Sequence, residues 1–347
     1  MSDVARASLR HLSLELSTET PLRAYEFLKK TQNLDSLNVH VCPPVFGVEH
    51  DPMKESERLM TVILRCPGLR TLRTFTHTGY DSLFRNVTHL SHFLSRTPDL
   101  DRLSMILPNQ LGALESRSLI FPSTRALRYA TIISPKFDGT LRALLAAISK
   151  SIESLELLVN HAITDPKAAR SALYSLGPRL KYLSFHANIP PADYRFLDSL
   201  PFHLHGLRGL YLSRGTCTSA LFENLHHAKK LRYLGLAGCL PDVVKEDKVI
   251  EFLQAIGSRS VTPVGEFECA CDDGSTTQRT RSLKRRFRRL VLFPLVNQAT
   301  DPPIPLDSPL FDTCRSAGVR LKLETSLPAQ FSDVGQVNCR QTEPIWH

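Results

Sequence analysis

Large apolar residues recur along the chain in one spacing, L-x-x-L-x-L, in which leucine predominates. The most regular copy is Leu207, Leu210 and Leu212. Between Leu69 and Leu231 the copies follow one another at steps of 24 to 31 residues, which is typical of a repeat array. The copies begin at Leu9, Leu34, Leu69, Leu100, Leu127, Ile152, Leu180, Leu207, Leu231 and Phe287, and Val319-Leu321-Leu323 closes the series.

Each copy predicts a short β-strand, because alternate apolar residues place one side of a strand against a core. The residues between copies have helical periodicity, as in Leu141, Leu144 and Ile148. Asp165 followed by Pro166 predicts the start of another helix. A strand–helix unit buries only one face, so neighbouring units must stack. The pattern predicts an α/β solenoid, a curved horseshoe with parallel strands on its concave face and helices on its convex face.

The composition agrees with a leucine-periodic fold. Of 347 residues, 54 are leucine and only 16 are glycine, which disfavours glycine-loop nucleotide folds. Hydrophobic residues make up 42% and charged residues 22%, a balance typical of a globular chain rather than a disordered one. A chain of this length forms two domains or an elongated array. The repeats favour the array.

Part of the pattern carries a family resemblance. The segment 231–239, LRYLGLAGC, resembles a cysteine-containing leucine-rich repeat, and the segment 65–72, RCPGLRTL, resembles the irregular repeats of fungal F-box/leucine-rich-repeat proteins. The resemblance covers residues 9–323 and implies a leucine-rich-repeat solenoid. An Asn or Cys three residues beyond the last apolar position, a further element of such repeats, is found at Cys42, Asn160, Asn188 and Cys239.

The resemblance also implies a function. F-box proteins recognise substrates for ubiquitin ligases, and they dock on the ligase adaptor through an N-terminal helical module. Here the first repeat begins at Leu9, and no Leu-Pro-led helical module precedes it. The chain is then either a fragment without its F-box or a repeat-only relative. A ubiquitin-ligase adaptor is expected as a partner only if an F-box is missing from this chain.

The repeats are expected to span residues 1–327, as ten to eleven units with one long interruption. The copies at Leu231 and Phe287 lie 56 residues apart, and the polar segment 258–282 between them has no apolar periodicity. Insertions of this length are usually exposed, so 258–282 is expected to be a loop on the surface. Residues 328–347 are expected to form a loosely ordered C-terminal tail.

The sequence contains no recognisable enzyme signature: no G-x-S-x-G, no P-loop, no G-x-G-x-x-G and no H-E-x-x-H. A zinc site needs four converging ligands, and histidines on solvated surfaces are the simpler explanation for the densest histidine group. We therefore expect a non-catalytic protein with no cofactor and no metal. The densest histidine group is His203, His205, His226 and His227.

Two absences bear on location. No apolar run approaches the length of a membrane span, and residues 1–10 lack the apolar core of a secretory signal. The eight cysteines are then expected to be reduced thiols. A cytoplasmic or nuclear location without membrane contact is expected.

Residues between the inward leucines point into the hollow of the predicted horseshoe. Four of the eight tyrosines fall on these positions, and Tyr182, Tyr211 and Tyr233 are expected to form a nearly contiguous aromatic strip. Tyrosine is enriched at binding hot spots, although strand propensity alone explains it equally well. The candidate protein-binding residues are Tyr129, Glu156, Tyr182, His186, Tyr211 and Tyr233.

The formal net charge of +9 is mostly local, because seven positive and no negative charges lie between Gly274 and Thr300. This basic segment is explained by a solvated flank of the weak tenth repeat, a nuclear-import signal, an anionic surface contact or nucleic-acid binding. The charges are Arg279, Arg281, Lys284, Arg285, Arg286, Arg288 and Arg289. The sequence thus favours a module that binds an unknown protein partner on its concave face. The alternative is a nucleic-acid-binding protein that acts through residues 279–289.

Overall fold

The structure is a computed structural model. It describes residues 9–16, 28–42, 52–79, 82–84, 86–108, 121–187, 189, 195–213, 216–237, 245–258, 289–293 and 308–323.

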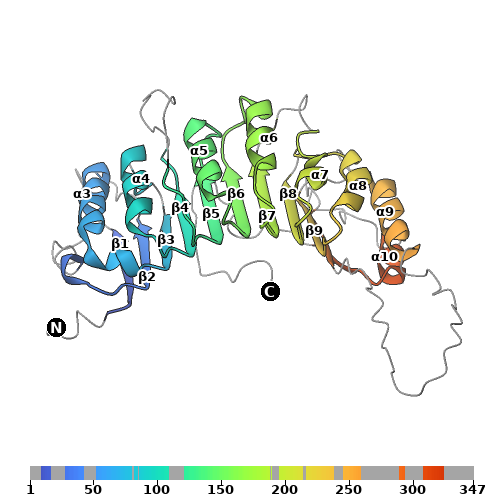
Figure 1. Cartoon of the computed structure of the whole chain (residues 1–347). Helices are drawn as coiled ribbons and strands as arrows, with labels where there is room; N and C mark the ends of the chain where they lie inside the picture. The colour runs from blue at the N-terminus through green and yellow to red at the C-terminus, as the bar shows by residue number, and fades with distance from the viewer. Residues whose placement is uncertain are drawn as a thin grey trace, which may run out of the picture.

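The described residues form one sheet of eleven strands, ordered along the sheet as they are along the chain. Every strand pairs with the next in parallel. Figure 1 shows the sheet bending into an open arc from β1 at one end to the strands beside α10 at the other. The strands are β1 His11–Leu16, β2 Ser36–Val41, β3 Thr74–Gly79, β4 Arg102–Ile106, β5 Tyr129–Ser134, β6 Ser154–Val159, β7 Tyr182–Ala187, β8 Gly209–Ser213, β9 Tyr233–Ala237, β10 Arg289–Phe293 and β11 Arg320–Leu323.

Helices connect most of the strands and cover one face of the sheet, the outer side of the arc (Figure 1). Within the described ranges, no helix covers the inner side. The expected α/β architecture, a repeat-like alternation of parallel strands and helices, is confirmed. The helices are α3 Pro52–Arg65, α4 Val87–Arg96, α5 Gly139–Ile148, α6 Pro166–Tyr174, α7 Leu200–His203, α8 Ala220–Asn224, α9 Glu246–Ser258 and α10 Pro309–Ser316, with short 3-10 helices at Pro67–Thr71 and Leu225–His227.

The core lies between the sheet and the helices. In β6 the side chains of Leu155 and Leu157 face the helices and are fully buried. In α5 the side chains at positions 141, 144 and 148 are buried as well, which is the apolar stripe expected from the sequence. Burying each such side chain contributes about 1.5–3 kcal/mol, so the regular leucine frame accounts for the stacking of the units.

Aspartate side chains fix where two of the helices begin. The carboxylate of Asp165 accepts a hydrogen bond from the backbone N–H of Ala168 at 3.0 Å, and Pro166 occupies the first turn. Asp138 caps α5 in the same way, accepting from Leu141 N–H at 3.0 Å. Capping satisfies backbone donors that have no partner within the helix. The predicted helix start at Asp165 is confirmed.

The register corrects one repeat. The sequence placed the third copy at Leu69, but β3 pairs Leu37 with Phe75, so the third copy begins three residues later, at Leu72. Leu69 instead lies in the 3-10 helix Pro67–Thr71 and is fully buried there. An L-x-x-L spacing occurs in a tight helical turn as well as just before a strand. The spacing of Leu69 and Leu72 was therefore ambiguous, and this caused the error.

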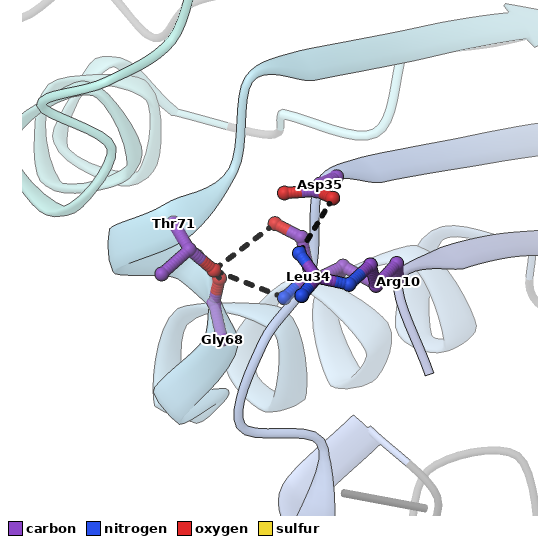
Figure 2. Close-up of polar contacts among 5 residues, drawn as sticks. All are labelled: Arg10, Leu34, Asp35, Gly68 and Thr71. Atoms are coloured by element: carbon purple, nitrogen blue, oxygen red, sulfur yellow. Dashed lines mark hydrogen bonds and ion pairs between the residues drawn. The ribbon is translucent and has the colours of Figure 1, made fainter. Parts of the chain in front are cut away.

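Side-chain bonds to the backbone join successive units. The Thr71 hydroxyl accepts a hydrogen bond from Leu34 N–H at 3.0 Å and lies within donating distance of the Leu34 carbonyl at 3.2 Å (Figure 2). It also lies 3.1 Å from the Gly68 carbonyl oxygen. The Thr71 hydroxyl therefore lies within hydrogen-bonding distance of backbone groups from two neighbouring units. A β-carbon at Gly68 would lie 3.1 Å from the Thr31 carbonyl oxygen, so the two units meet closely here.

Some expectations fall outside the described residues. They are the loop at 258–282 beyond Ser258, the tail at 328–347 and the basic residues 279–288. Among the helices that the structure describes, none is long and apolar enough to cross a membrane.

Candidate protein-binding face

On the inner side of the sheet, here named the open face, equivalent residue positions form rows that run from strand to strand. Parallel pairing in register aligns equivalent positions along the whole sheet. The first row is His11, Ser36, Thr74, Arg102, Tyr129, Ser154, Tyr182, Gly209, Tyr233, Arg289 and Arg320. The second row is Ser13, Asn38, Thr76, Ser104, Thr131, Glu156, Ser184, Tyr211, Gly235, Val291 and Lys322. All six candidate residues lie on the open face.

The tyrosines do not form one continuous strip. Tyr182 and Tyr233 stand in the first row with Gly209 between them. Tyr211 belongs to the second row, where it pairs with Ser184 on one side and Gly235 on the other. The expected strip is therefore divided between two rows. Tyr182 and Tyr233 are partly exposed, whereas Tyr211 has an exposed fraction of only 2%.

His186 and Tyr211 form a buried polar pair on this face. Their ring centroids lie 4.9 Å apart, and the Nε2 atom of His186 shares a hydrogen bond of 3.1 Å with the Ser184 hydroxyl. Burial lowers the pKa of His186 to about 3, because a charged imidazolium is poorly solvated there. His186 is therefore neutral at physiological pH and acts in packing and hydrogen bonding rather than as a charge.

Glu156 lies in the second row, beside this pair along the sheet. The Thr131 hydroxyl donates to its Oε2 atom at 3.2 Å. Its Oε1 atom is buried and has no hydrogen-bond partner within the described part of the chain. Burial raises the pKa of the Glu156 carboxyl, and the bond from Thr131 only partly offsets this. The open face thus contains one carboxylate oxygen whose hydrogen-bonding capacity is unused.

Three aliphatic side chains form an apolar patch that sequence analysis missed. Ile106, Ile133 and Leu158 lie opposite one another on β4, β5 and β6, and Leu158 lies opposite His186 on β7. Each of the three is partly exposed and alternates with buried neighbours, which places it on the open face. These residues stand one position beyond the last apolar residue of the motif, the position that His186 occupies in its own repeat. The sequence candidates were tyrosines and polar residues, so aliphatic side chains at this position were passed over.

Tyr129 is packed between two arginines. The Arg102 guanidinium carbon lies 4.5 Å from the centre of its ring, and that of Arg128 lies 5.6 Å away. The Nε atom of Arg128 donates to Asp101 at 2.5 Å, and this contact raises the pKa of Arg128. The ring is therefore held by cation–π contacts at the N-terminal end of β5.

A line of charged residues borders the first row. Each strand from β1 to β9 is preceded by one charged residue, and successive residues are linked by backbone hydrogen bonds, as from Arg128 N–H to the Asp101 carbonyl at 3.0 Å. Three ion pairs join neighbours in this line: Arg10 with Asp35 at 3.2 Å (Figure 2), Arg128 with Asp101, and Lys181 with Glu153 at 2.5 Å. We name it the charged rim; its members are Arg10, Asp35, Arg73, Asp101, Arg128, Glu153, Lys181, Arg208 and Arg232.

The basic segment and the histidine group were the other candidates from the sequence. Of the basic segment, Arg289 alone is described, as the first residue of β10, and it lies directly opposite Tyr233 in the first row. Two of the clustered histidines contact aromatic rings: His203 stacks on Tyr174 with centroids 4.0 Å apart, and His227 lies tilted against Phe202 at 3.8 Å. Within the described ranges, no group of three His, Cys, Asp or Glu side chains could hold a metal ion.

The sequence was also compared with known proteins. No protein-family model matches the chain, and no curated protein matches it.

Proposed function

We propose that this protein is a non-catalytic binding module that recognises a protein partner on its open face. The observation that carries the proposal is a parallel sheet of eleven strands with helices on only one side among the described residues. Parallel sheets are usually covered on both faces. The face without a described helix in addition presents partly exposed tyrosines and the apolar patch of Ile106, Ile133 and Leu158. Aromatic and aliphatic groups of this kind supply most of the energy of protein interfaces.

The fold proposed with this function is a leucine-rich-repeat solenoid. Leucine-type positions occupy the core side of nearly every strand, and the units follow one another in sequence order. Within that proposal, the resemblance to F-box proteins suggests substrate recognition for a ubiquitin ligase, in the cytoplasm or nucleus. This narrower role requires an F-box in the same polypeptide.

A protein is a better candidate than a nucleic acid for this face. Single-stranded nucleic acid is held by bases stacked on successive aromatic rings above a basic groove. Here Gly209 separates Tyr182 from Tyr233, so adjacent strands do not offer successive rings in the first row. The patch around Ile133 suits apolar side chains rather than phosphates. Nucleic-acid binding through residues 279–289 is kept as the alternative.

The test uses two charged substitutions inside the patch and two on the outer surface. The patch variant is Ile133→Glu with Leu158→Glu. The matched control is Ala146→Glu with Ser171→Glu, at exposed positions on α5 and α6. Affinity capture from cells that express the protein, quantified by mass spectrometry, should give proteins retained by the wild type and the control but lost from the patch variant. Equal retention by all three would contradict the proposal.

A further inference from the structure

The alternation of charge along the charged rim stops towards its C-terminal end. Its signs alternate from Arg10 to Lys181, and then two further positive residues follow, Arg208 and Arg232. Consecutive rim residues are joined by the backbone bonds from Arg208 N–H to Lys181 O at 2.6 Å and from Arg232 N–H to Arg208 O at 2.7 Å. The three positive residues are far apart in sequence but are neighbours across adjacent strands.

The alternation has an electrostatic reason. Neighbouring strands lie about 4.8 Å apart, so rim charges interact with those on either side. Each acid from Asp35 to Glu153 stands between two cations, and three of these contacts are ion pairs. Arg208 and Arg232 adjoin only other cations in the rim, and neither makes an ion pair with any described residue. Like charges placed next to each other are unfavourable.

The strands at this end add positive charge and no negative charge. The first row continues through Arg289 on β10 to Arg320 on β11, and the second row ends at Lys322. No Asp or Glu occupies a rim position or a position in these two rows on β8 to β11. The backbone register therefore aligns five cationic positions on neighbouring strands, from segments that lie far apart in the sequence. They are Arg208, Arg232, Arg289, Arg320 and Lys322.

Aromatic residues occupy the first-row positions on either side of Gly209, next to Arg208. Gly209, which has no side chain, separates Tyr182 from Tyr233 by two strand spacings, roughly 10 Å. Tyr182 and Tyr233 are both partly exposed, and Arg208 and Arg232 lie next to them in the charged rim. Rigid aromatic side chains beside cationic groups suit a polypeptide with both apolar and acidic side chains.

We propose that the open face over β8 to β11 docks an acidic segment of the protein partner, with carboxylates paired to Arg208 and Arg232. The inference rests on the proposed function, because it specifies the chemistry of the partner. Elsewhere in the rim, acids pair with neighbouring cations. We infer that the partner supplies the acids that the described rim and the two rows lack on β8 to β11.

The test measures binding of labelled peptides to the full chain by fluorescence polarisation. The probes are decaglutamate, decaglutamine and a ten-nucleotide thymidine strand. The test variant is Arg208→Glu with Arg232→Glu, and the matched control is Arg142→Glu with Lys150→Glu, which changes the net charge equally at exposed positions on the helix side. Thermal melting confirms that each variant is folded. A milder pair, Arg208→Gln with Arg232→Gln, covers the case in which the reversal unfolds the chain.

Decaglutamate should bind at low salt, and the test variant should bind it about tenfold more weakly or worse, as removal of a hydrogen-bonded charge pair requires. The control should bind it normally, and decaglutamine should not bind. The inference is overturned if decaglutamate is not retained, if both variants lose it equally, or if the thymidine strand binds more tightly through the same arginines. Partner capture that survives the Arg208 and Arg232 reversal would refute this inference alone. Failure of the Ile133 and Leu158 test would refute the proposed function instead.

Discussion

The ring of Tyr211 lies directly across Gly235 on the next strand. A β-carbon at position 235 would fall 2.1 Å from Cδ2 of Tyr211 and 2.7 Å from its Cε2. The two residues are register partners of β8 and β9 in the second row. A missing side chain on one strand thus accommodates a large one on its neighbour. The Tyr211 side chain is nearly fully buried although it belongs to the open face.

Substitution of Gly235 with Ala should therefore displace the Tyr211 ring. We expect a loss of about 1–3 kcal/mol in the free energy of unfolding, the usual result of overpacking. Denaturant unfolding measures it. In a Tyr211→Ala background the same substitution should leave the free energy of unfolding almost unchanged, because the ring no longer occupies the space next to position 235. A cost that persists without the Tyr211 ring would show that the close approach is not its cause.

The Thr71 hydroxyl should be important for joining the second and third units. Thr71→Val keeps the shape but removes the acceptor for Leu34 N–H, so it should lower the unfolding free energy by about 1–3 kcal/mol. Thr61→Val is the control, since the Thr61 hydroxyl donates only to the Glu57 carbonyl within an exposed part of its own helix. Equal losses at the two positions would rule out a special role for Thr71.

His186 should make stability depend on pH. Its pKa in the folded chain is about 3, below the ordinary value of 6.5, so the unfolded chain takes up this proton first as the pH falls. The stabilisation is complete above pH 6.5 and is lost between pH 6.5 and about 3. Between pH 6.5 and 5 the wild type should lose up to about 1.4 kcal/mol per pH unit more than His186→Gln. Parallel curves for the two proteins would contradict the assignment.

The charged rim predicts opposite effects for two similar charge reversals. Arg208→Glu would continue the alternation between Lys181 and Arg232, so stability should rise by about 0.2–1 kcal/mol. Arg73→Glu would place three acids in a row, with Asp35 and Asp101 on either side, so stability should fall by a similar amount. Thermal or denaturant unfolding of the two variants compares them directly. Both reversals acting in the same direction would refute the electrostatic account of the rim.

Much of the fold was predictable because the leucines of the repeat motif are the residues that the fold buries. The pattern located every strand except β3, where Leu69 and Leu72 are both buried and only the pairing of Phe75 separates them. The helix start at Asp165 was also readable, because a capping carboxylate and a first-turn proline act locally.

The site was less predictable because it depends on neighbours across strands. The sequence does indicate that Tyr211 follows a core leucine whereas Tyr182 precedes one, which already separates their rows. Aligned repeats place Tyr211 opposite Gly235 and Tyr233 opposite Arg289, although 51 residues separate β9 from β10. They do not indicate that the ring of Tyr211 lies across Gly235. The charge alternation of the rim lies at the residue after the first apolar position of each repeat, and it becomes complete once the third copy is moved to Leu72.

The most direct measurement of the central claim is site-specific photocrosslinking within cells that express the protein. A photoreactive phenylalanine analogue is placed at Leu158, in the centre of the open face, or at Ala146, on the exposed side of α5. Binding on the open face predicts covalent adducts with a protein partner at position 158 and none at position 146. Adducts at position 146 alone, or equal yields at both positions, would contradict it.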